Sequence, residues 1–520
     1  MRHTKKWFFA LLTLCLALLF FTACSGDDKE ETRRQSAILG EDDELTAWAT
    51  DNSIDFGGEK IVISLSKYTS GIILNQSTQY IEGPDKVSSD PVMTKILERN
   101  ERISSAIGIE PRYVYTNVNY VGIIPDIEQK VLAPGKDTPD LYIDQAYGLV
   151  RSQIKGHLKN VYGSESEKSY VDFSVDGWYA DYMSAFNFGS QDKLYMLAGD
   201  YFMDVLRFTN TIGCNLSLFD DIFPKEGGRQ YLYRTVSAGD GKTGGFTYDV
   251  LTAWCEAAYK DADHNGSYTE GDRVGLYSHS SGPAGMGFMP TCDVSLYNIN
   301  ENGTFSVFEG PDKRSLDAVI TIRQLLLNTK GVYYNPYATN AFDSVVTFVN
   351  KGALFISGML LFYLENEEFR QMEDDKCVIP YPKLYESDTE YVTTTHDNAR
   401  MGAILASSNK LTEVTAWVQA MALTSGDVRE TYYQGALKFK YGTDAGTTHM
   451  LDTVYNTISA PYWIICDAIP EHGDYNVINP ISHMVYLVKD TNTYVSDYQS
   501  ARTPLRSALA AYMTEFSKLK

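Results

Sequence analysis

The sequence has few residues of the kinds that build catalytic metal or redox centres. It contains 8 histidines and 7 cysteines in 520 residues, and no two cysteines form a C-x-x-C pair. The P-loop, the G-x-S-x-G turn and the H-E-x-x-H motif are absent, and Gly282 to Gly287 lack the dinucleotide-binding spacing. We therefore expect no enzyme activity and no catalytic cofactor, and we interpret the internal cysteines as small buried residues.

Positive charge is also scarce. The chain has 67 acidic and 45 basic residues, a formal net charge of −22, and no basic stripe. Such a surface repels phosphate backbones, which excludes nucleic acid as a partner. Glu365, Glu367 and Glu368 could imitate the carboxylate pair of a glycosidase, so a secreted glycan-cleaving enzyme stays an alternative. We interpret this acidic run as a solvated helix face.

Long apolar runs are limited to two. The first, Trp7 to Phe21, follows a short basic head and has about 15 residues, the length of a signal-peptide core and too short to span a bilayer. It leads into Thr22-Ala23-Cys24, where small residues before a cysteine resemble a bacterial lipobox. We predict a signal peptide over 1–23 and a lipid on Cys24. The second run, Gly352 to Leu364, is expected to be buried core.

After the lipobox the chain changes character. Residues 24–59 are rich in charge, serine and glycine, which predicts a flexible tether between the lipid and the folded body. Strand-like runs at Ile61–Leu65, Arg112–Tyr115 and Pro139–Ile143 alternate with a helical pattern over Pro91–Ile107. This alternation is typical of βαβ units, and it predicts an α/β fold with a mainly parallel sheet.

The most specific single motif is the loop KDADHNGSYTEGD, Lys260 to Asp272. If its first aspartate is position 1, oxygen-bearing side chains stand at positions 1, 3, 5, 7 and 12 and a glycine at 6, the spacing of an EF-hand-type calcium loop. The expected ligands are Asp261, Asp263, Asn265, Ser267 and Asp272. The sequence therefore predicts a structural calcium ion, and an aspartate-rich turn without an ion is the alternative.

Several segments together resemble a known family. The matching stretches are Asp192–Asp200 (DKLYMLAGD), Tyr233–Val236 with Phe246–Asp249 (YRTV, FTYD), Phe348–Phe355 (FVNKGALF), Val378–Lys383 (VIPYPK) and Tyr432–Tyr441 (YYQGALKFKY). Their order and spacing are similar to those of the extracellular solute-binding lipoproteins of carbohydrate ABC transporters. The departures are a phenylalanine for tryptophan in FTYD, an altered order in NKG and a missing spacer in VIPYPK.

The resemblance implies a two-lobed type 2 periplasmic-binding-protein fold with hinge crossings and a ligand cleft between the lobes. We expect lobe 1 to comprise 60–165 and 396–460, and lobe 2 to comprise 166–395 and a closing segment, 461–520. The implied function is to capture an extracellular carbohydrate and deliver it to the membrane subunits of an ABC importer. The protein would be a monomer held at the outer face of the cell membrane by its lipid alone, as in Gram-positive cells.

The resemblance also implies where the sugar binds. Ligands of such folds lie at the carboxyl ends of the strands, and sugars stack on aromatic rings while carboxylates and amides accept their hydroxyl protons. The expected ligand-binding residues are Tyr68, Asp144, Gln145, Trp178, Tyr179, Asp200, Asp293, Ser357, Asp397 and Trp463. A surface glycan-binding lipoprotein that works with an outer-membrane porin is a further alternative, and such a chain would consist mostly of helical repeats.

Overall fold

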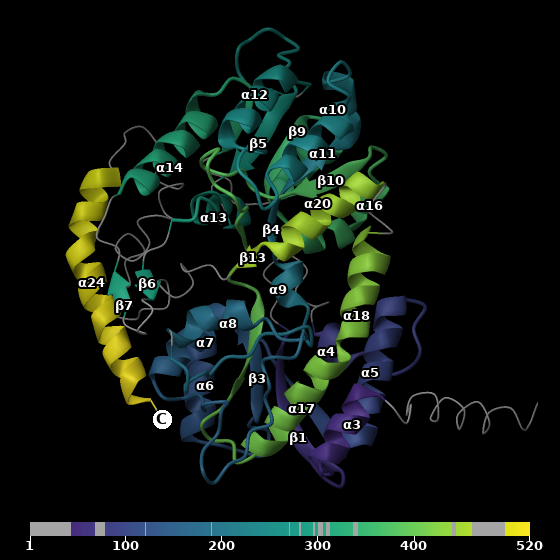
Figure 1. Cartoon of the computed structure of the whole chain (residues 1–520), viewed down its shortest axis with the longest axis vertical. Helices are drawn as coiled ribbons and strands as arrows, with labels where there is room; N and C mark the ends of the chain where they lie inside the picture. Colours follow the sequence, from purple (N-terminus) through teal and green to yellow (C-terminus); the bar gives the residue numbers. More distant parts are fainter. Residues whose placement is uncertain are drawn as a thin grey trace, which may run out of the picture.

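The computed structural model describes two lobes, each built around its own β-sheet (Figure 1). The described residues are 43–67, 78–119, 121–188, 190–269, 271–279, 282–294, 297–299, 305–307, 312–335, 342–438, 444–459 and 494–519. Within these ranges no helix has both the length and the apolar character needed to span a membrane.

The first lobe holds a four-stranded sheet of order β12-β3-β1-β2. Its strands are β1 (Glu59–Ser66), β2 (Ile109–Thr116), β3 (Leu141–Gln145) and β12 (Arg400–Ile404). β1 is parallel to β2 and β3, whereas β12 is antiparallel to β3. The helices of this lobe are α3 (Glu44–Asp51), α4 (Gln79–Glu82), α5 (Pro91–Ile107), α6 (Ile123–Leu132), α7 (Ala146–Ile154), α8 (Ala180–Asn187), α17 (Leu411–Thr424) and α24 (Tyr494–Lys518).

Helix α5 shows how local sequence sets these elements. Asp90 caps its first turn by accepting a hydrogen bond from Val92 N at 2.8 Å, and Pro91 occupies the first helical position, where no N–H is needed. Gly108 ends the helix in the left-handed region at φ 65°. Ile96, Ile103 and Ile107 face the core. The helix predicted over Pro91–Ile107 is therefore confirmed.

The second lobe holds a mixed five-stranded sheet of order β10-β4-β9-β5-β8. Its strands are β4 (Asn210–Asn215), β5 (Val274–His279), β8 (Val332–Asn335), β9 (Ala353–Leu360) and β10 (Lys376–Ile379), and β6 (Tyr297–Ile299) and β7 (Phe305–Val307) form a separate pair. Around them lie α10 (Leu216–Ile222), α11 (Arg229–Ala238), α12 (Tyr248–Ala258), α13 (Gly282–Thr291), α14 (Lys313–Arg323), η1 (Gln324–Asn328), α15 (Phe342–Val349), η2 (Leu361–Glu365), α16 (Glu367–Gln371) and α20 (Ala445–Asn456). Every residue of β9 is buried, which confirms the apolar run of Gly352 to Leu364 as core.

The chain passes between the lobes at three places. The first passage contains α9 (Asp204–Arg207), and the second follows β11 (Thr393–Thr394), which pairs with β13 (Ile458–Ser459). Thr209 and Thr395 form an antiparallel bridge, so these two passages lie side by side. The third passage is formed by α18 (Gly426–Glu430) and the π-helical segment η3 (Thr431–Lys438).

The start of the folded body differs from the expected tether over 24–59. Residues 44–51 form α3, whose Leu45 is only 1% exposed and whose Trp48 packs edge-on against Tyr170. Asp43 caps the helix and pairs with Arg102 of α5 at 2.5 Å. Buried side chains and a cap hold this segment on the first lobe, so the tether prediction is wrong for 43–59.

Three lobe boundaries also differ from the expected ones. Residues 166–203 belong to the first lobe, because Trp178 Nε1 donates to Gln419 and Leu197 bridges Gly402 of β12. Helix α20 packs on β10 and α11 of the second lobe, and Thr447 bonds Tyr233 at 2.8 Å. The second part of the first lobe therefore ends before 444, and not at 460.

The third difference concerns the C-terminal helix. The aromatic rings of Phe188 and Tyr195 in the first lobe contact Phe516 of α24, and the Tyr512 hydroxyl lies 3.5 Å from Val150 O. The later half of α24 thus docks on the first lobe, although 461–520 was expected to close the second. Short apolar stretches predict that a helix forms but do not predict which surface it covers.

Candidate functional site

Asp144 lies at the carboxyl end of β3, one residue before the strand ends. Its side chain is fully buried, and Oδ1 accepts a hydrogen bond from Gln145 N at 2.9 Å. Burial raises the pKa of this carboxyl from its usual 3.8 to about 6, although the nearby Arg400 guanidinium favours the ionised form. A buried carboxylate whose desolvation is incompletely offset by its neighbours is a candidate for ligand binding.

Gln145 stands beside Asp144 and immediately precedes α7. It is 4% exposed, and its Oε1 atom has no hydrogen-bond partner within the described part of the chain. Arg400, the first residue of β12, pairs with Gln145 in the antiparallel register. The sequence therefore correctly placed Asp144 and Gln145 together at a strand end, but the approach of Arg400 from a strand 255 positions later could not be read from it.

In the second lobe, Ser357 lies on β9 and Asn210 lies on β4, the strands next to the passages between the lobes. Ser357 lies on the buried β9, and its hydroxyl donates to Ser278 of β5 at 2.8 Å. Asn210 begins β4 opposite Leu360, the last residue of β9. It is fully buried, and both polar atoms of its carboxamide lack a hydrogen-bond partner among the residues that the structure describes. No periodicity or motif singled out Asn210.

Asp397 lies on the second passage between the lobes. Its Oδ1 atom is 2.7 Å from His396 Nδ1, and His396 N donates to Phe208 O of the first passage at 2.9 Å. The preceding Thr395 hydroxyl donates to the Tyr182 hydroxyl of α8 at 3.1 Å. The structure therefore places Asp397 at the hinge, between the two sheets.

Two of the predicted ligand residues, Tyr179 and Asp200, contact each other. Asp200 also pairs with Arg429, an arginine that the sequence did not single out. The Tyr179 hydroxyl donates to Asp200 Oδ1 at 2.7 Å, and Arg429 Nη1 donates to Asp200 Oδ2 at 2.6 Å. Arg429 Nη2 also reaches Asp176 Oδ2 at 2.5 Å. Burial raises the pKa of the Asp200 carboxyl to about 6, whereas Arg429 and Tyr179 lower it. Because Arg429 lies on α18, this cluster joins the first lobe to the third passage.

Trp178 takes a different place from the one predicted. It is 6% exposed, its indole N–H donates to Gln419 Oε1 at 3.1 Å, and its ring packs edge-on against Phe173 and Tyr201. A ring that stacks on a sugar needs a free face, and this one is enclosed by core side chains. The structure therefore does not support Trp178 as a sugar-stacking residue.

Four further predicted residues stand apart from this group. Asp293 follows α13, is exposed, has a positive φ of 54°, and makes no hydrogen bond to the other described candidates. Tyr68 and Trp463, together with the lipidation residue Cys24, lie outside the described residues.

The predicted calcium loop has converging carboxylates. One oxygen each from Asp261, Asp263 and Asp272 lies within 4.8 Å of the others. Gly266 N donates to Asp261 at 2.9 Å, and Gly266 has φ 75°, the left-handed conformation that a sharp turn requires. Hydrogen bonds from the backbone of Ala262 and Thr269 lower the pKa of the Asp272 carboxyl. Oxygen donors at this spacing suit a hard cation such as calcium.

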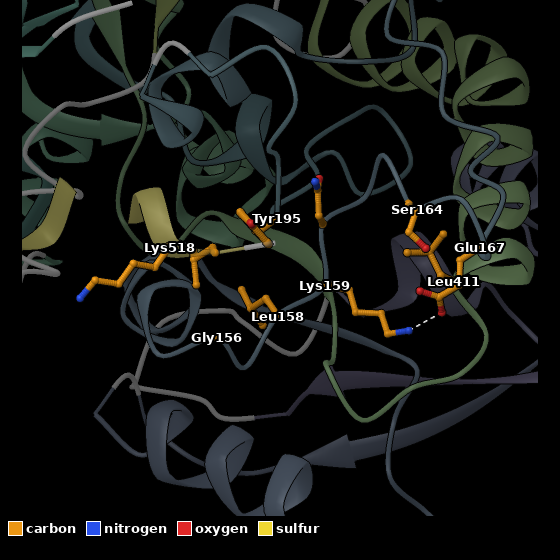
Figure 2. Close-up of a pocket in the computed structure, with 11 residues that line it drawn as sticks. Gly156, Leu158, Lys159, Ser164, Glu167, Tyr195, Leu411 and Lys518 are labelled. Atoms are coloured by element: carbon orange, nitrogen blue, oxygen red, sulfur yellow. Dashed lines mark hydrogen bonds and ion pairs between the residues drawn. The ribbon is translucent and has the colours of Figure 1, made fainter. Parts of the chain in front are cut away.

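A cavity of about 400 Å³ lies elsewhere, on the first lobe beneath the end of α24 (Figure 2). Leu158, Tyr195 and Leu411 supply apolar walls, and Lys159 pairs with Glu167 at one side. None of the predicted ligand residues lines it, so this cavity is separate from the candidate site.

Comparisons with known proteins agree with the fold. No family model matches the sequence, and no curated protein matches it. The galacto-N-biose-/lacto-N-biose I-binding protein of an ABC transporter from Bifidobacterium longum, solved with lacto-N-biose, is 14% identical with a TM-score of 0.53; the match covers 88% of this chain and 98% of that one. The cyclic α-maltosyl-1,6-maltose binding protein from Arthrobacter globiformis is 12% identical with a TM-score of 0.54, over 87% and 99%.

An ABC substrate-binding protein from Listeria monocytogenes, solved with cycloalternan, gives the same result. It is 12% identical with a TM-score of 0.51, and the match covers 87% of this chain and 99% of that chain. The chain has the two-lobed α/β fold of periplasmic binding proteins, which confirms the predicted fold class. Two sheets in two lobes also differ from the helical repeats expected of a porin-associated glycan-binding lipoprotein.

Proposed function

We propose that this protein captures a carbohydrate between its two lobes and delivers it to the membrane subunits of an ABC importer. The observation that carries the proposal is the buried Asp144 carboxylate at the end of β3, in a two-lobed fold similar to those of sugar-binding proteins. Ligands of open α/β sheets bind outside the carboxyl ends of their strands. Asp144 stands at such a position.

The chemistry of this edge suits a neutral sugar. Hydroxyl groups of a sugar would donate to Asp144 and to the unpartnered Gln145 Oε1, and the bonds so formed would offset the desolvation of the carboxylate. Asn210 on the second lobe offers both a donor and an acceptor. A sugar held by both lobes would favour their closure, and no covalent bond needs to change.

The test is to capture a sugar and recover it unchanged. Purified protein is incubated with a panel of mono- and oligosaccharides, separated by size, denatured, and the released sugar is weighed by mass spectrometry. The proposal predicts stoichiometric recovery of one intact sugar class. Recovery of shortened products that accumulate with time would instead support a glycan-cleaving enzyme, and recovery of no sugar would contradict the proposal.

We also propose that the protein is a monomer anchored outside the cell by a lipid on Cys24. The support is the basic head, the short apolar core and the Thr22-Ala23-Cys24 sequence. Because α3 is folded on the first lobe, any tether ends before 43 and not at 59. Cys24→Ala should release the protein from membranes or leave it unprocessed, and unchanged partitioning into detergent would exclude this anchor.

We further propose that the loop of Asp261 to Asp272 binds a structural calcium ion. Three carboxylates converge there, and Asn265 and Ser267 stand at the remaining ligand positions of the motif. Tyr268 of the same loop packs against Tyr333 of β8 and Tyr277 of β5, with ring centroids 4.4 and 6.1 Å apart. An ion bound there would brace the edge of the second sheet and leave the sugar site untouched.

A further inference from the structure

A row of buried charges runs through the hinge from the first lobe to the second. In spatial order it consists of Asp144, Arg400, Asp204, Arg207 and Glu365; Arg400 is paired across the sheet with Gln145, the neighbour of Asp144. The side chains of Asp204 and Arg207 are 0% exposed, and that of Glu365 is 16% exposed. Charges in a row of this kind alternate in sign, so each is held by its neighbours.

The centre of the row is α9, which belongs to the first passage between the lobes. Asp204 Oδ2 lies 3.6 Å from Arg400 Nη1 and accepts a hydrogen bond from Arg400 N at 3.3 Å. Its other carboxylate oxygen lies 3.6 Å from Arg207 Nη1. Asp204 therefore ties α9 to the start of β12, where the second passage enters the first lobe.

Arg207 makes the connection to the second lobe. It donates to both carboxylate oxygens of Glu365, at 3.1 Å from Nε and 3.0 Å from Nη2. The Tyr432 hydroxyl of η3 donates to the same carboxylate at 2.6 Å, which adds the third passage. The Arg207 guanidinium also lies over the Tyr80 ring of the first lobe, 4.6 Å from its centroid. The first and third passages thus meet at this pair, and the second is joined to it through Asp204.

Burying these charges is costly, and packing alone does not require them. Apolar residues of similar size are often as stable as a buried ion pair, whereas removal of one partner leaves an uncompensated charge. At the first-lobe end of the row, Asp144 Oδ2 has no hydrogen-bond partner among the residues that the structure describes. Asp144 stands at the end where a ligand's hydroxyl donors would supply the missing compensation.

We propose that Asp204 and Arg207 are positioning residues of the hinge, which hold Arg400 next to the Asp144 end of β3 on one side and Glu365 on the other. Through them the ligand-facing edge of the first lobe is coupled to the angle between the lobes. This inference rests on the proposed function of Asp144 as a sugar-binding residue. The coupling itself is a property of the chain without ligand.

The test measures the distance between the lobes in the ligand-free full chain. Dyes are attached through clickable amino acids at the exposed positions Gln129 of α6 and Ile320 of α14, which lie on different lobes (Figure 1). Single-molecule energy transfer then gives the ratio of short to long distances. Arg207→Lys and Glu365→Gln should each change this ratio by about fivefold or more, the scale of a modest coupling between sites.

Arg229→Lys is the matched control. Arg229 also pairs with carboxylates, those of Asp220, Asp375 and Asp444, but all four residues lie within the second lobe. It should lower the melting temperature without changing the distance ratio. If Arg207→Lys and Glu365→Gln lower the melting temperature and likewise leave the ratio unchanged, the row is only structural and the proposal is overturned.

A double-mutant cycle tests the link to Asp144. Asp144→Asn should change the distance ratio in the parent chain, and its effect should be at least about threefold smaller when Glu365→Gln is already present. Equal effects in both backgrounds, or no effect in either, would overturn the coupling. Because no sugar is added, a chain that binds no sugar but still shows the coupling would contradict the proposed function and not this inference.

Discussion

The Tyr179 hydroxyl donates a 2.7 Å hydrogen bond to the buried Asp200 carboxylate. Arg429, on the third passage between the lobes, donates to the same carboxylate. The first two residues lie 21 positions apart in an aromatic, turn-rich stretch, and the sequence predicted both as ligand-binding residues without pairing them. The arginine comes 229 positions after Asp200. Only the fold explains how a carboxylate can be buried there.

Removal of that arginine should destabilise the protein in a pH-dependent way. The pKa of Asp200 is raised to about 6, so the stability linked to its neutral form is fully present below about pH 4 and is lost as the pH rises through 6. Arg429→Met leaves the carboxylate unpaired, which should cost about 3–5 kcal/mol of unfolding free energy at pH 8. At pH 5 the carboxyl takes up a proton, so the cost should be smaller.

Urea unfolding at pH 5 and pH 8 measures both values. Arg112→Met is the control, because Arg112 pairs with the exposed Asp137 at the surface. It should cost less than about 1 kcal/mol at either pH. A loss from Arg429→Met that is the same at both pH values would show that Asp200 is not the group that responds.

Asp144→Asn should make the protein more stable at high pH while weakening sugar binding. The raised pKa of Asp144 means that its ionisation opposes folding, so the parent chain loses stability as the pH rises through about 6. A pKa rise of this size corresponds to about 3 kcal/mol. The amide cannot ionise, so the variant should be more stable by up to that amount at pH 8 and equal near pH 4.

Denaturant titrations of both proteins between pH 4 and pH 8 check this prediction. Asp137→Asn, at an exposed position, is the control and should give a difference near zero throughout. A parent chain that is as stable as Asp144→Asn at pH 8 would mean that Arg400 and the surrounding dipoles fully compensate the carboxylate.

Trp178 should behave as a core residue. Trp178→Ala should lower the free energy of unfolding by about 3–5 kcal/mol, because a large ring packed against Phe173 and Tyr201 is removed. Trp178→Phe should cost less, and sugar affinity measured by calorimetry should stay within a factor of about two. A Trp178→Phe chain that has the parent melting temperature but no longer binds the sugar would show that Trp178 belongs to the binding site.

The loop of Asp261 to Asp272 should make stability depend on calcium. Chelation should lower the melting temperature of the parent chain, and Asp261→Ala should remove that response because one of three converging carboxylates is lost. Asp221→Ala, which removes an exposed acid elsewhere in the second lobe, should keep it. Melting curves that coincide in calcium and in chelator would show that the loop is a turn that binds no ion.

Much of the local structure could be predicted from the sequence. The strand at Ile61–Leu65 and the helix at Pro91–Ile107 follow from apolar periodicity and from capping residues next to them in the chain. The predicted strand Arg112–Tyr115 likewise falls within β2. These signals are local, so one sequence is enough to read them.

What could not be predicted depends on contacts between distant segments. β12 joins the first sheet antiparallel to β3, and no periodicity within Arg400–Ile404 states which strand it meets. The sequence also suggested a tether where α3 folds, because charged residues outnumber apolar ones over 24–59 as a whole. Two buried side chains, Leu45 and Ala49, are enough to dock the helix. Arg207 and Arg400 look like ordinary surface charges until the hinge buries them.

The central claim is that a sugar binds at Asp144, and calorimetric titration tests it most directly. The sugar class recovered from the capture experiment is titrated into the parent chain, Asp144→Asn and Asp137→Asn. The account predicts saturable binding of one sugar per chain, unchanged in Asp137→Asn and at least about tenfold weaker in Asp144→Asn, the loss of a charge-assisted hydrogen bond. Equal affinity for all three proteins, or no heat of binding in any of them, would contradict it.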